Sequence, residues 1–295
     1  MSRSEYARVR MGTRTRIVMY TDRPDQADAA AEAAFDRIEQ MEAVLSDWRL
    51  ESEVVALRSS QPATWRGVSP DLERALRVSR VVSDMTAGAF DPACGRMTQS
   101  WRQARDRGTP PPTWNEEIAE VGPPGDRVQI RSGGVRFMAP VPWLDFGGVG
   151  KGLAADAAIG TLRAHGVSAA MVDIGGDIAC GGPPPIRSGW RVQVPGSHIE
   201  LELAWCGVAT SGAGAQSIGP DSHILDPRTG RWMQRHDDVT VIAPSGAMAD
   251  ALASAGCVLG APRLARAVGG HDGIIVRSAA LPNPDTGCQG GSTGQ

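Results

Sequence analysis

The sequence is poor in aromatic residues and has no excess of basic charge. Aromatic residues make up 5% of the 295 residues, and the formal net charge is −3. Nucleic-acid-binding proteins carry a basic surface, and single-strand binders add aromatic side chains on which bases stack. We therefore expect no nucleic-acid partner.

Cysteine is also scarce. The five cysteines are scattered, and none forms a CxxC pair; they are Cys94, Cys180, Cys206, Cys257 and Cys288. An odd number at such spacing argues against a disulfide framework or a zinc site. Reduced, mostly buried thiols are the expectation.

Long apolar runs are absent as well. No run reaches the roughly 20 residues that a membrane-spanning helix needs, and the first residues lack the apolar centre of a signal peptide. We therefore expect a cytoplasmic protein without a membrane anchor. The 41% apolar and 21% charged residues are ordinary for a globular chain.

The first part of the chain carries clear periodic patterns. Residues 7–20 alternate between polar and apolar, which predicts one or two strands around Gly12. Residues 25–45 have apolar residues at helical spacing. Ser69 followed by Pro70 is a strong helix start, and that helix is expected to run to about Asp84.

The middle of the chain mixes charge, proline and glycine. Residues 102–125 are expected to form a surface connection that holds one short helix. A strand is expected within 134–146, followed by a glycine-rich turn and a helix from Lys151 to about His165, where Gly166 ends it.

Most of the remaining chain is strand-like. A helix is expected over 248–259, and the tail 283–295 is rich in Gly, Ser and Pro and is expected to be disordered. Strands are expected at 168–174, 190–194, 199–204, 206–210, 238–243 and 273–277. Helices in clusters and strands in runs predict an α+β fold with mixed sheets and packed helices. We expect one catalytic unit over 1–282, with two subdomains divided near 102–125 as the alternative.

The glycine-rich segment Asp145 to Gly152 is the most informative stretch. Glycines before a helix start allow backbone N–H groups to approach a phosphate, and Lys151 adds a positive charge there. The segment is neither a Walker A loop nor a GxGxxG fingerprint, because Gly152 follows Lys151 and Leu153 stands where the last glycine would be. A tight structural turn with a surface lysine explains the pattern equally well.

Two further segments carry candidate polar groups. Asp250 and Ser254 are four residues apart in an expected helix, so both lie on one face and offer oxygen ligands suited to magnesium. An aspartate favoured by the helix dipole explains Asp250 as well. His223 precedes an Asp-Pro-x-Thr-Gly turn, and its ordinary pKa suits a general base near neutrality. A lone histidine is more often structural.

Three other stretches are weak signals when taken singly. Trp48 would be a core residue or would stack on a flat ring. Residues 86–92 would form a loop that ends a helix, and the Met11-Gly12-Thr13 segment would form a bulge in a strand.

Taken together and in this order, these stretches resemble the ApbE family of flavin transferases from about Val9 to Arg277. The matching patterns are Met-Gly-Thr, Ser-x-aromatic-Arg-x-x-Ser-Glu from Ser46, Gly-Ala-Phe-Asp-Pro from Gly88, Asp-x-Gly-Gly-x-x-Lys-Gly from Asp145, Asp-Ile-Gly-Gly-Asp from Asp173, Ser-His-Ile-x-Asp-Pro-x-Thr-Gly from Ser222, and Ala-Asp-Ala-Leu-Ala from Ala249. The resemblance implies an ApbE-like fold.

The resemblance also implies roles for individual residues. FAD, the substrate, would contact Met11, Trp48, Ala89, Phe90, Asp91, Asp145, Lys151 and Ile224. Magnesium would be held by the Gly148 carbonyl with Asp250 and Ser254, where Ser254 replaces the family's more usual threonine. His223 matches a histidine thought to act in catalysis.

The implied reaction transfers the FMN half of FAD to a threonine or serine hydroxyl of a target flavoprotein and releases AMP. Two alternatives use the same site. A pyrophosphatase would hydrolyse FAD to FMN and AMP, and a non-catalytic protein would bind FAD without turnover. The segment 212–222, which is shorter than in many relatives, is the best support for the last.

Overall fold

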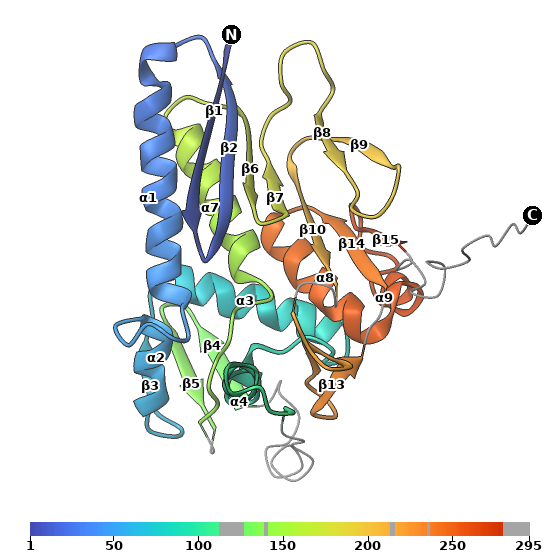
Figure 1. Cartoon of the computed structure of the whole chain (residues 1–295). Helices are drawn as coiled ribbons and strands as arrows, with labels where there is room; N and C mark the ends of the chain where they lie inside the picture. Colours follow the sequence, from blue (N-terminus) through green and yellow to red (C-terminus); the bar gives the residue numbers. More distant parts are fainter. Residues whose placement is uncertain (112–126, 139–140, 213–215, 235–236, 280–295) are drawn as a thin grey trace, which may run out of the picture.

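The computed structural model describes residues 1–111, 127–138, 141–212, 216–234 and 237–279 (Figure 1). A seven-stranded sheet forms its centre, in the order β1-β2-β6-β7-β10-β14-β15, and every neighbouring pair is antiparallel. Its strands are β1 (Ser2–Arg10), β2 (Thr13–Thr21), β6 (Ala169–Ile174), β7 (Asp177–Cys180), β10 (Cys206–Ser211), β14 (Asp238–Ala243) and β15 (Ile275–Ala279).

Helices pack against this sheet and against one another. Helices α7 and α8 pack on the central strands, α1 packs on α7, and α3 contacts both α1 and α8. Figure 1 shows α1 running beside the β1–β2 hairpin and α3 crossing below it. The helices are α1 (Ala27–Leu45), α2 (Glu53–Ala56), α3 (Pro70–Met85), α4 (Gly95–Arg107), α7 (Gly150–Ala164), α8 (Gly246–Leu259) and α9 (Ala261–Ala267). Short 3-10 helices are η1 (Pro24–Gln26), η2 (Leu57–Ser59) and η3 (Pro92–Cys94).

Three small sheets surround the central one. The first holds β3 (Trp65–Gly67), β5 (Gly134–Phe137) and β4 (Val128–Arg131). The second holds β11 (Ser217–Ile218), β12 (Asp221–Asp226) and β13 (Arg231–Gln234). The third is the β8 (Trp190–Gln193) and β9 (Glu200–Leu203) pair, which lies at the upper right of Figure 1.

Local sequence signals account for several element boundaries. The Ser69 hydroxyl accepts a hydrogen bond from the Leu72 N–H at 3.2 Å, so this residue caps α3 as expected. Gly166, with φ +79°, follows the last turn of α7, where a left-handed residue ends a helix. Met11 and Gly12 also have positive φ and form the turn between β1 and β2.

Close backbone contact joins the two helices that carry the candidate site. A Cβ atom at Gly152 of α7 would lie 2.2 Å from the Gly246 carbonyl oxygen, and one at Gly207 of β10 would lie 2.2 Å from the Gly246 nitrogen. Only glycine permits such spacing, because no real Cβ contact is that short. The start of α8 is therefore held tightly between α7 and β10.

One sequence prediction was wrong in detail. Residues 102–107 belong to helix α4 rather than to a surface connection, because Trp101 and Ala104 form a buried stripe that the many arginines conceal in the sequence. The strand expected within 134–146 is present as β5 and ends at Phe137, and residues 141–146 have no regular secondary structure.

Some expectations fall outside the described residues: the part of 102–125 beyond residue 111, the tail 283–295 and Cys288. Within the described ranges, no helix combines the length and the apolar character that crossing a bilayer requires.

Candidate active site

The glycine turn at residues 147–149 brings α7 and α8 together. The Ser254 hydroxyl of α8 lies 3.5 Å from the Gly148 carbonyl oxygen, to which it donates. A Cβ atom at Gly148 would lie 2.8 Å from that hydroxyl oxygen and 3.2 Å from the Phe90 ring. Position 148 therefore has room for a backbone carbonyl but no side chain.

Asp250 lies one helical turn before Ser254 and is buried. Its Oδ2 accepts a hydrogen bond from the Gly152 N–H at 3.0 Å, and its Oδ1 lies 3.8 Å from the Lys151 Nζ. The same Nζ forms a closer ion pair, at 2.6 Å, with Asp177 at the start of β7. The first turn of α7 thus faces two carboxylates from different elements.

Burial and mutual charge govern the ionisation of this cluster. Burial lowers the pKa of Lys151, but the Asp250 and Asp177 carboxylates outweigh it and raise that pKa overall, so the ammonium stays charged. Burial and then the negative charge of Asp250 raise the pKa of Asp177 to about 7. When both carboxylates are ionised, this group carries two negative charges against one positive charge.

The predicted metal ligands are compatible with magnesium in their chemistry. A backbone carbonyl, a hydroxyl and a carboxylate are all hard oxygen donors, the kind that magnesium prefers. Gly148 and Ser254 already bring two of these oxygens within 3.5 Å of each other. Among the described residues, no group of three or more His, Cys, Asp and Glu side chains forms a metal site, so a site here relies on a single carboxylate together with neutral oxygens.

Asp145 is fixed from four sides. Its backbone N–H donates to the Pro92 carbonyl at 2.7 Å, and its carboxylate accepts from the Gly147 N–H at 2.7 Å. Two side chains of α4 reach it as well: the Thr98 hydroxyl at 2.5 Å and the Arg102 guanidinium at 3.3 Å. The GAFDP loop and the glycine turn are therefore joined through Asp145.

Arg102 also forms an ion pair with Asp47, the neighbour of Trp48. Asp47 is buried, and burial followed by the charge of Asp145 raises its pKa. Trp48 itself is 62% exposed, which excludes the interpretation that it is a core residue. An exposed indole next to a fixed residue leaves a flat apolar face for a ligand.

The loop of Ala89, Phe90 and Asp91 is almost entirely buried. Phe90 packs against Gly148, and Asp91 caps η3 by accepting from the Ala93 N–H at 2.9 Å. Burial raises the pKa of Asp91 to about 6. A Cβ atom at Gly88 would lie 3.5 Å from the Arg228 side chain, so this loop meets the turn that follows β12.

Met11 reaches the same region from the β1–β2 turn. Its N–H donates to Glu42 of α1 at 3.0 Å, and its terminal methyl lies 3.7 Å from where a Cβ atom at Gly150 would stand. Met11 therefore lies at the start of α7, beside the glycine turn.

His223 and Ile224 lie on β12, which packs against α8. The His223 Nδ1 lies 3.2 Å from the Gln216 carbonyl oxygen, and its ring meets Trp101 of α4 edge-on at 6.1 Å between centroids. The Ile224 N–H donates to the Ser222 hydroxyl at 3.2 Å. The histidine thus lies beside Trp101 of α4, on a strand that packs against α8.

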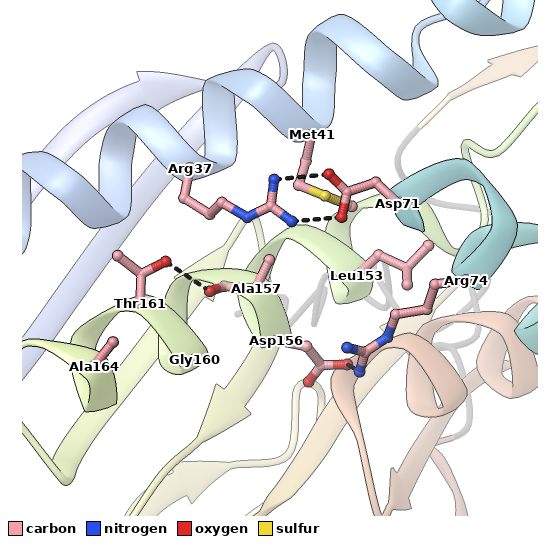
Figure 2. Close-up of a pocket in the computed structure, with 10 residues that line it drawn as sticks. All are labelled: Arg37, Met41, Asp71, Arg74, Leu153, Asp156, Ala157, Gly160, Thr161 and Ala164. Carbon is pink, nitrogen blue, oxygen red and sulfur yellow. Dashed lines mark hydrogen bonds and ion pairs between the residues drawn. The ribbon is translucent and has the colours of Figure 1, made fainter. Parts of the chain in front are cut away.

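A separate hollow of about 340 Å³ lies between α1, α3 and α7 (Figure 2). None of the predicted site residues lines it. Figure 2 shows Arg37 and Asp71 pointing toward each other across it, in an ion pair with one contact at 2.7 Å. Arg37 pairs with Asp71, the Thr161 hydroxyl donates to the Ala157 carbonyl, and Asp156 accepts from backbone N–H groups. Since these polar groups already have partners, we assign the candidate site to the glycine turn instead.

Asp156, which lines this hollow, links it to the site. Its two carboxylate oxygens accept from the Gly246 N–H at 2.8 Å and the Ala247 N–H at 3.0 Å, at the start of α8. Burial raises the pKa of Asp156. A carboxylate at a helix N-terminus satisfies backbone donors that have no partner inside the helix.

Sequence reasoning missed four residues of this arrangement: Thr98, Arg102, Asp156 and Asp177. Thr98 and Arg102 are four residues apart, a spacing that places both on one face of a helix, but the charge and proline of residues 102–125 favour a connection. Asp177 ends the Asp-Ile-Gly-Gly-Asp pattern, which by itself does not indicate that Lys151 is its partner. Asp156 carries no sequence signal that points to α8.

The chain is similar to known proteins both in sequence and in fold. A model of the ApbE family matches residues 11–276. The FAD:protein FMN transferase of Treponema pallidum (strain Nichols) is 31% identical, in a match that covers 87% of this chain and 79% of that protein. The apo crystal structure of the Pseudomonas stutzeri flavinyl transferase ApbE gives a TM-score of 0.81 at 22% identity, covering 94% of this chain and 95% of that one.

A second solved structure is equally similar. The crystal structure of the ApbE protein from Thermotoga maritima gives a TM-score of 0.80 at 25% identity, covering 95% of this chain and 94% of that one. The expected α+β, ApbE-like fold is thereby confirmed.

Proposed function

This chain belongs to the ApbE family, and we propose that it is an FAD:protein FMN transferase, the activity that names its Treponema pallidum relative. The transfer places the FMN half of FAD on a threonine or serine hydroxyl of a target flavoprotein and releases AMP. The single catalytic unit over 1–282, the cytoplasmic location and the absence of a nucleic-acid partner stay predictions.

One observation carries the proposal. Asp250 of α8 contacts the Lys151 ammonium and the Gly152 N–H at the start of α7, and Ser254, one turn further along α8, contacts the Gly148 carbonyl. A helix N-terminus with a lysine ammonium beside it attracts a pyrophosphate, the group that joins the two halves of FAD. Hard oxygens beside it suit a divalent cation.

Magnesium would be held by the Gly148 carbonyl, Asp250 and Ser254. When Asp177 is ionised, the two carboxylates outnumber the Lys151 ammonium, which favours a divalent cation at this place. When bound, the ion would supply charge neutralisation on the pyrophosphate oxygens.

Other side chains of the protein would bind and position FAD. Lys151 would bind a phosphoryl oxygen, and Trp48 would cover one face of the flavin ring. Asp145, held by Thr98 and Arg102, would fix the bound FAD, with Met11, Ile224 and the loop of residues 89–91 as further contacts. Such positioning is the main protein contribution to phosphoryl transfer.

The transfer forms one bond to phosphorus and breaks another. The acceptor hydroxyl oxygen forms a bond to the phosphorus on the FMN side, and the bond from that phosphorus to the bridging oxygen breaks. The bridging oxygen and its electron pair leave with AMP. His223 would accept the hydroxyl proton, since an imidazole is a common general base in enzymes.

The test is mass spectrometry of a panel of flavin-acceptor domains, each incubated with this protein, FAD and magnesium. The proposal expects a mass gain of one FMN moiety on a single threonine or serine of at least one domain, together with AMP. Asp250→Ala and His223→Ala variants would lose the gain.

Two results would overturn the proposal. AMP and FMN formed at full rate with no acceptor modified would identify a pyrophosphatase. Tightly bound FAD left intact across the whole panel would identify a binding protein.

A further inference from the structure

Two cysteines face each other across neighbouring strands of the central sheet. Cys180 is the last residue of β7, Cys206 is the first residue of β10, and the antiparallel register pairs them directly. Directly opposed residues in antiparallel strands have Cα atoms about 4.5 to 5.5 Å apart. A disulfide requires Cα atoms roughly 4.4 to 6.8 Å apart, so the backbone already meets its spacing.

Both side chains lie on the same face of the sheet. Cys180 is buried in an apolar cluster with Trp190 and Val192 of β8, and Cys206 packs against that cluster. Residues directly opposite each other on neighbouring strands project to the same face, so the register brings the two thiol side chains next to each other.

The two thiols differ in their environment. Cys206 is partly exposed, and the adjacent Cys180 thiol lowers its pKa against the opposing effect of burial. Cys180 is buried, and the adjacent Cys206 thiol, followed by burial, raises its pKa. Cys206 is accordingly the thiol that an oxidant in solution reaches first, because it is the more exposed of the two.

We propose that Cys180 and Cys206 are a redox modification site that closes into a cross-strand disulfide on contact with a small-molecule disulfide such as oxidised glutathione. The Cys206 thiolate attacks one sulfur of the oxidant, and a first small thiolate leaves. Cys180 then loses its proton and attacks the Cys206 sulfur, and a second small thiolate leaves. Two cysteine thiols are oxidised and one small disulfide is reduced to two thiols.

The bridge would form behind the candidate active site. Alternate residues of the same strands face the helices: Ala179 belongs to the main core, and Gly207 touches the start of α8. The cysteines project to the opposite face and are separate from the FAD and magnesium residues. A serine at either position is therefore compatible with the proposed transfer activity, and the inference does not depend on it.

The test uses the full chain in a Cys288→Ser background, which leaves only the described cysteines. The reduced protein is treated with oxidised glutathione, free thiols are trapped with N-ethylmaleimide under denaturing conditions, and unreduced digests are analysed by mass spectrometry. We expect one cross-linked peptide pair that holds Cys180 and Cys206, and loss of N-ethylmaleimide from both together. Cys94 and Cys257 would remain fully labelled.

Matched variants make the result specific. Cys206→Ser would abolish the cross-link and leave Cys180 labelled, whereas Cys257→Ser would leave the cross-link intact. The proposal is overturned if Cys206 carries stable glutathione while Cys180 stays labelled, if both thiols stay free, or if either pairs with another cysteine.

Discussion

Gly148 and Ser254 touch across the junction of α7 and α8, with the serine hydroxyl 3.5 Å from the glycine carbonyl. The contact is possible because position 148 has no side chain: a Cβ atom there would lie 2.8 Å from the same hydroxyl oxygen and 3.2 Å from Phe90. The position of the Ser254 hydroxyl therefore depends on the backbone at Gly148 and on the absence of a side chain there.

Replacement of this glycine is expected to damage the site. In Gly148→Ala the new methyl would displace Ser254 and Phe90, and kcat/KM for FMN transfer would fall by about 100-fold, as small misplacements of reacting groups do. Gly160→Ala is the control, because a Cβ there has no neighbour within 4 Å. That change stabilises α7 by up to about 1 kcal/mol. If the two variants had equal activity, the glycine turn would not be part of the active site.

For magnesium-dependent activity, the hydroxyl group of Ser254 is expected to matter more than the shape of its side chain. Ser254→Ala would raise the magnesium concentration for half-maximal activity at least about tenfold, since even groups that only support metal ligands cost that much. Ser254→Thr keeps the hydroxyl and would stay within a few-fold of the parent. A magnesium titration of initial rates measures both, and an unchanged midpoint in the alanine variant would exclude Ser254 as a ligand.

These residues show which part of the site a sequence can predict. Asp250 and Ser254 share a helix, so spacing alone places them on one face, and the Asp145 to Gly152 segment is local as well. Asp177 reaches Lys151 from another element, and its partner depends on strand pairing that spacing does not reveal. The same limit hid the register of Cys180 and Cys206.

The same limit applies to the fold: elements with a strong local sequence signal could be predicted, and elements without one could not. The hairpin around Gly12 and helices α1, α3, α7 and α8 followed from periodicity and capping residues such as Ser69. Helix α4 did not, because its charge masks the buried Trp101 and Ala104. The short strands β7, β12 and β13 each pair with a neighbouring strand along the chain, but their own patterns of four to six residues are too short to mark them as strands.

Trp48 is expected to contribute to flavin affinity through stacking. Its indole is 62% exposed, and stacking of a flat ring on an aromatic side chain contributes roughly 1 to 3 kcal/mol. Trp48→Ala would therefore weaken FAD binding by about 5- to 150-fold. Trp48→Phe would recover part of this loss. Trp205→Ala, at another exposed tryptophan, would leave the Kd unchanged in a fluorescence titration. Equal Kd values for the two alanine variants would contradict the role of Trp48.

Asp156 is expected to hold the first turn of α8. Asp156→Asn would keep at most one of the two hydrogen bonds to Gly246 and Ala247 and leave a buried N–H unpaired, which costs about 1 to 3 kcal/mol. Arg74→Gln is the control, because Arg74 is exposed and its contact with Asp156 is 4.0 Å long, so its loss costs under about 1 kcal/mol. Urea unfolding separates the two. Similar losses of unfolding free energy in the two variants would mean that Asp156 acts through its ion pair with Arg74 rather than through its hydrogen bonds to α8.

Asp91 gives the stability of the chain a defined pH dependence. Burial raises its pKa in the folded state from 3.8 to about 6. Below pH 4 the carboxyl is protonated in both states. As pH rises from about 4 to 6 the unfolded chain ionises first, so the free energy of unfolding falls by about 3 kcal/mol through this group. Above about pH 6 the carboxyl is ionised in both states, so its contribution to the free energy of unfolding no longer changes with pH.

Asp91→Asn removes this titration and keeps the oxygen that accepts from the Ala93 N–H. Because all other groups are shared, the stability of the variant relative to the parent would rise between pH 4 and 6 and then level off. Urea unfolding of both proteins without FAD, at four pH values from 4 to 7, measures the difference. A difference that stays constant over this range would mean that Asp91 ionises at its ordinary pKa, and the loop of residues 89–91 would then be open to water rather than packed against Gly148.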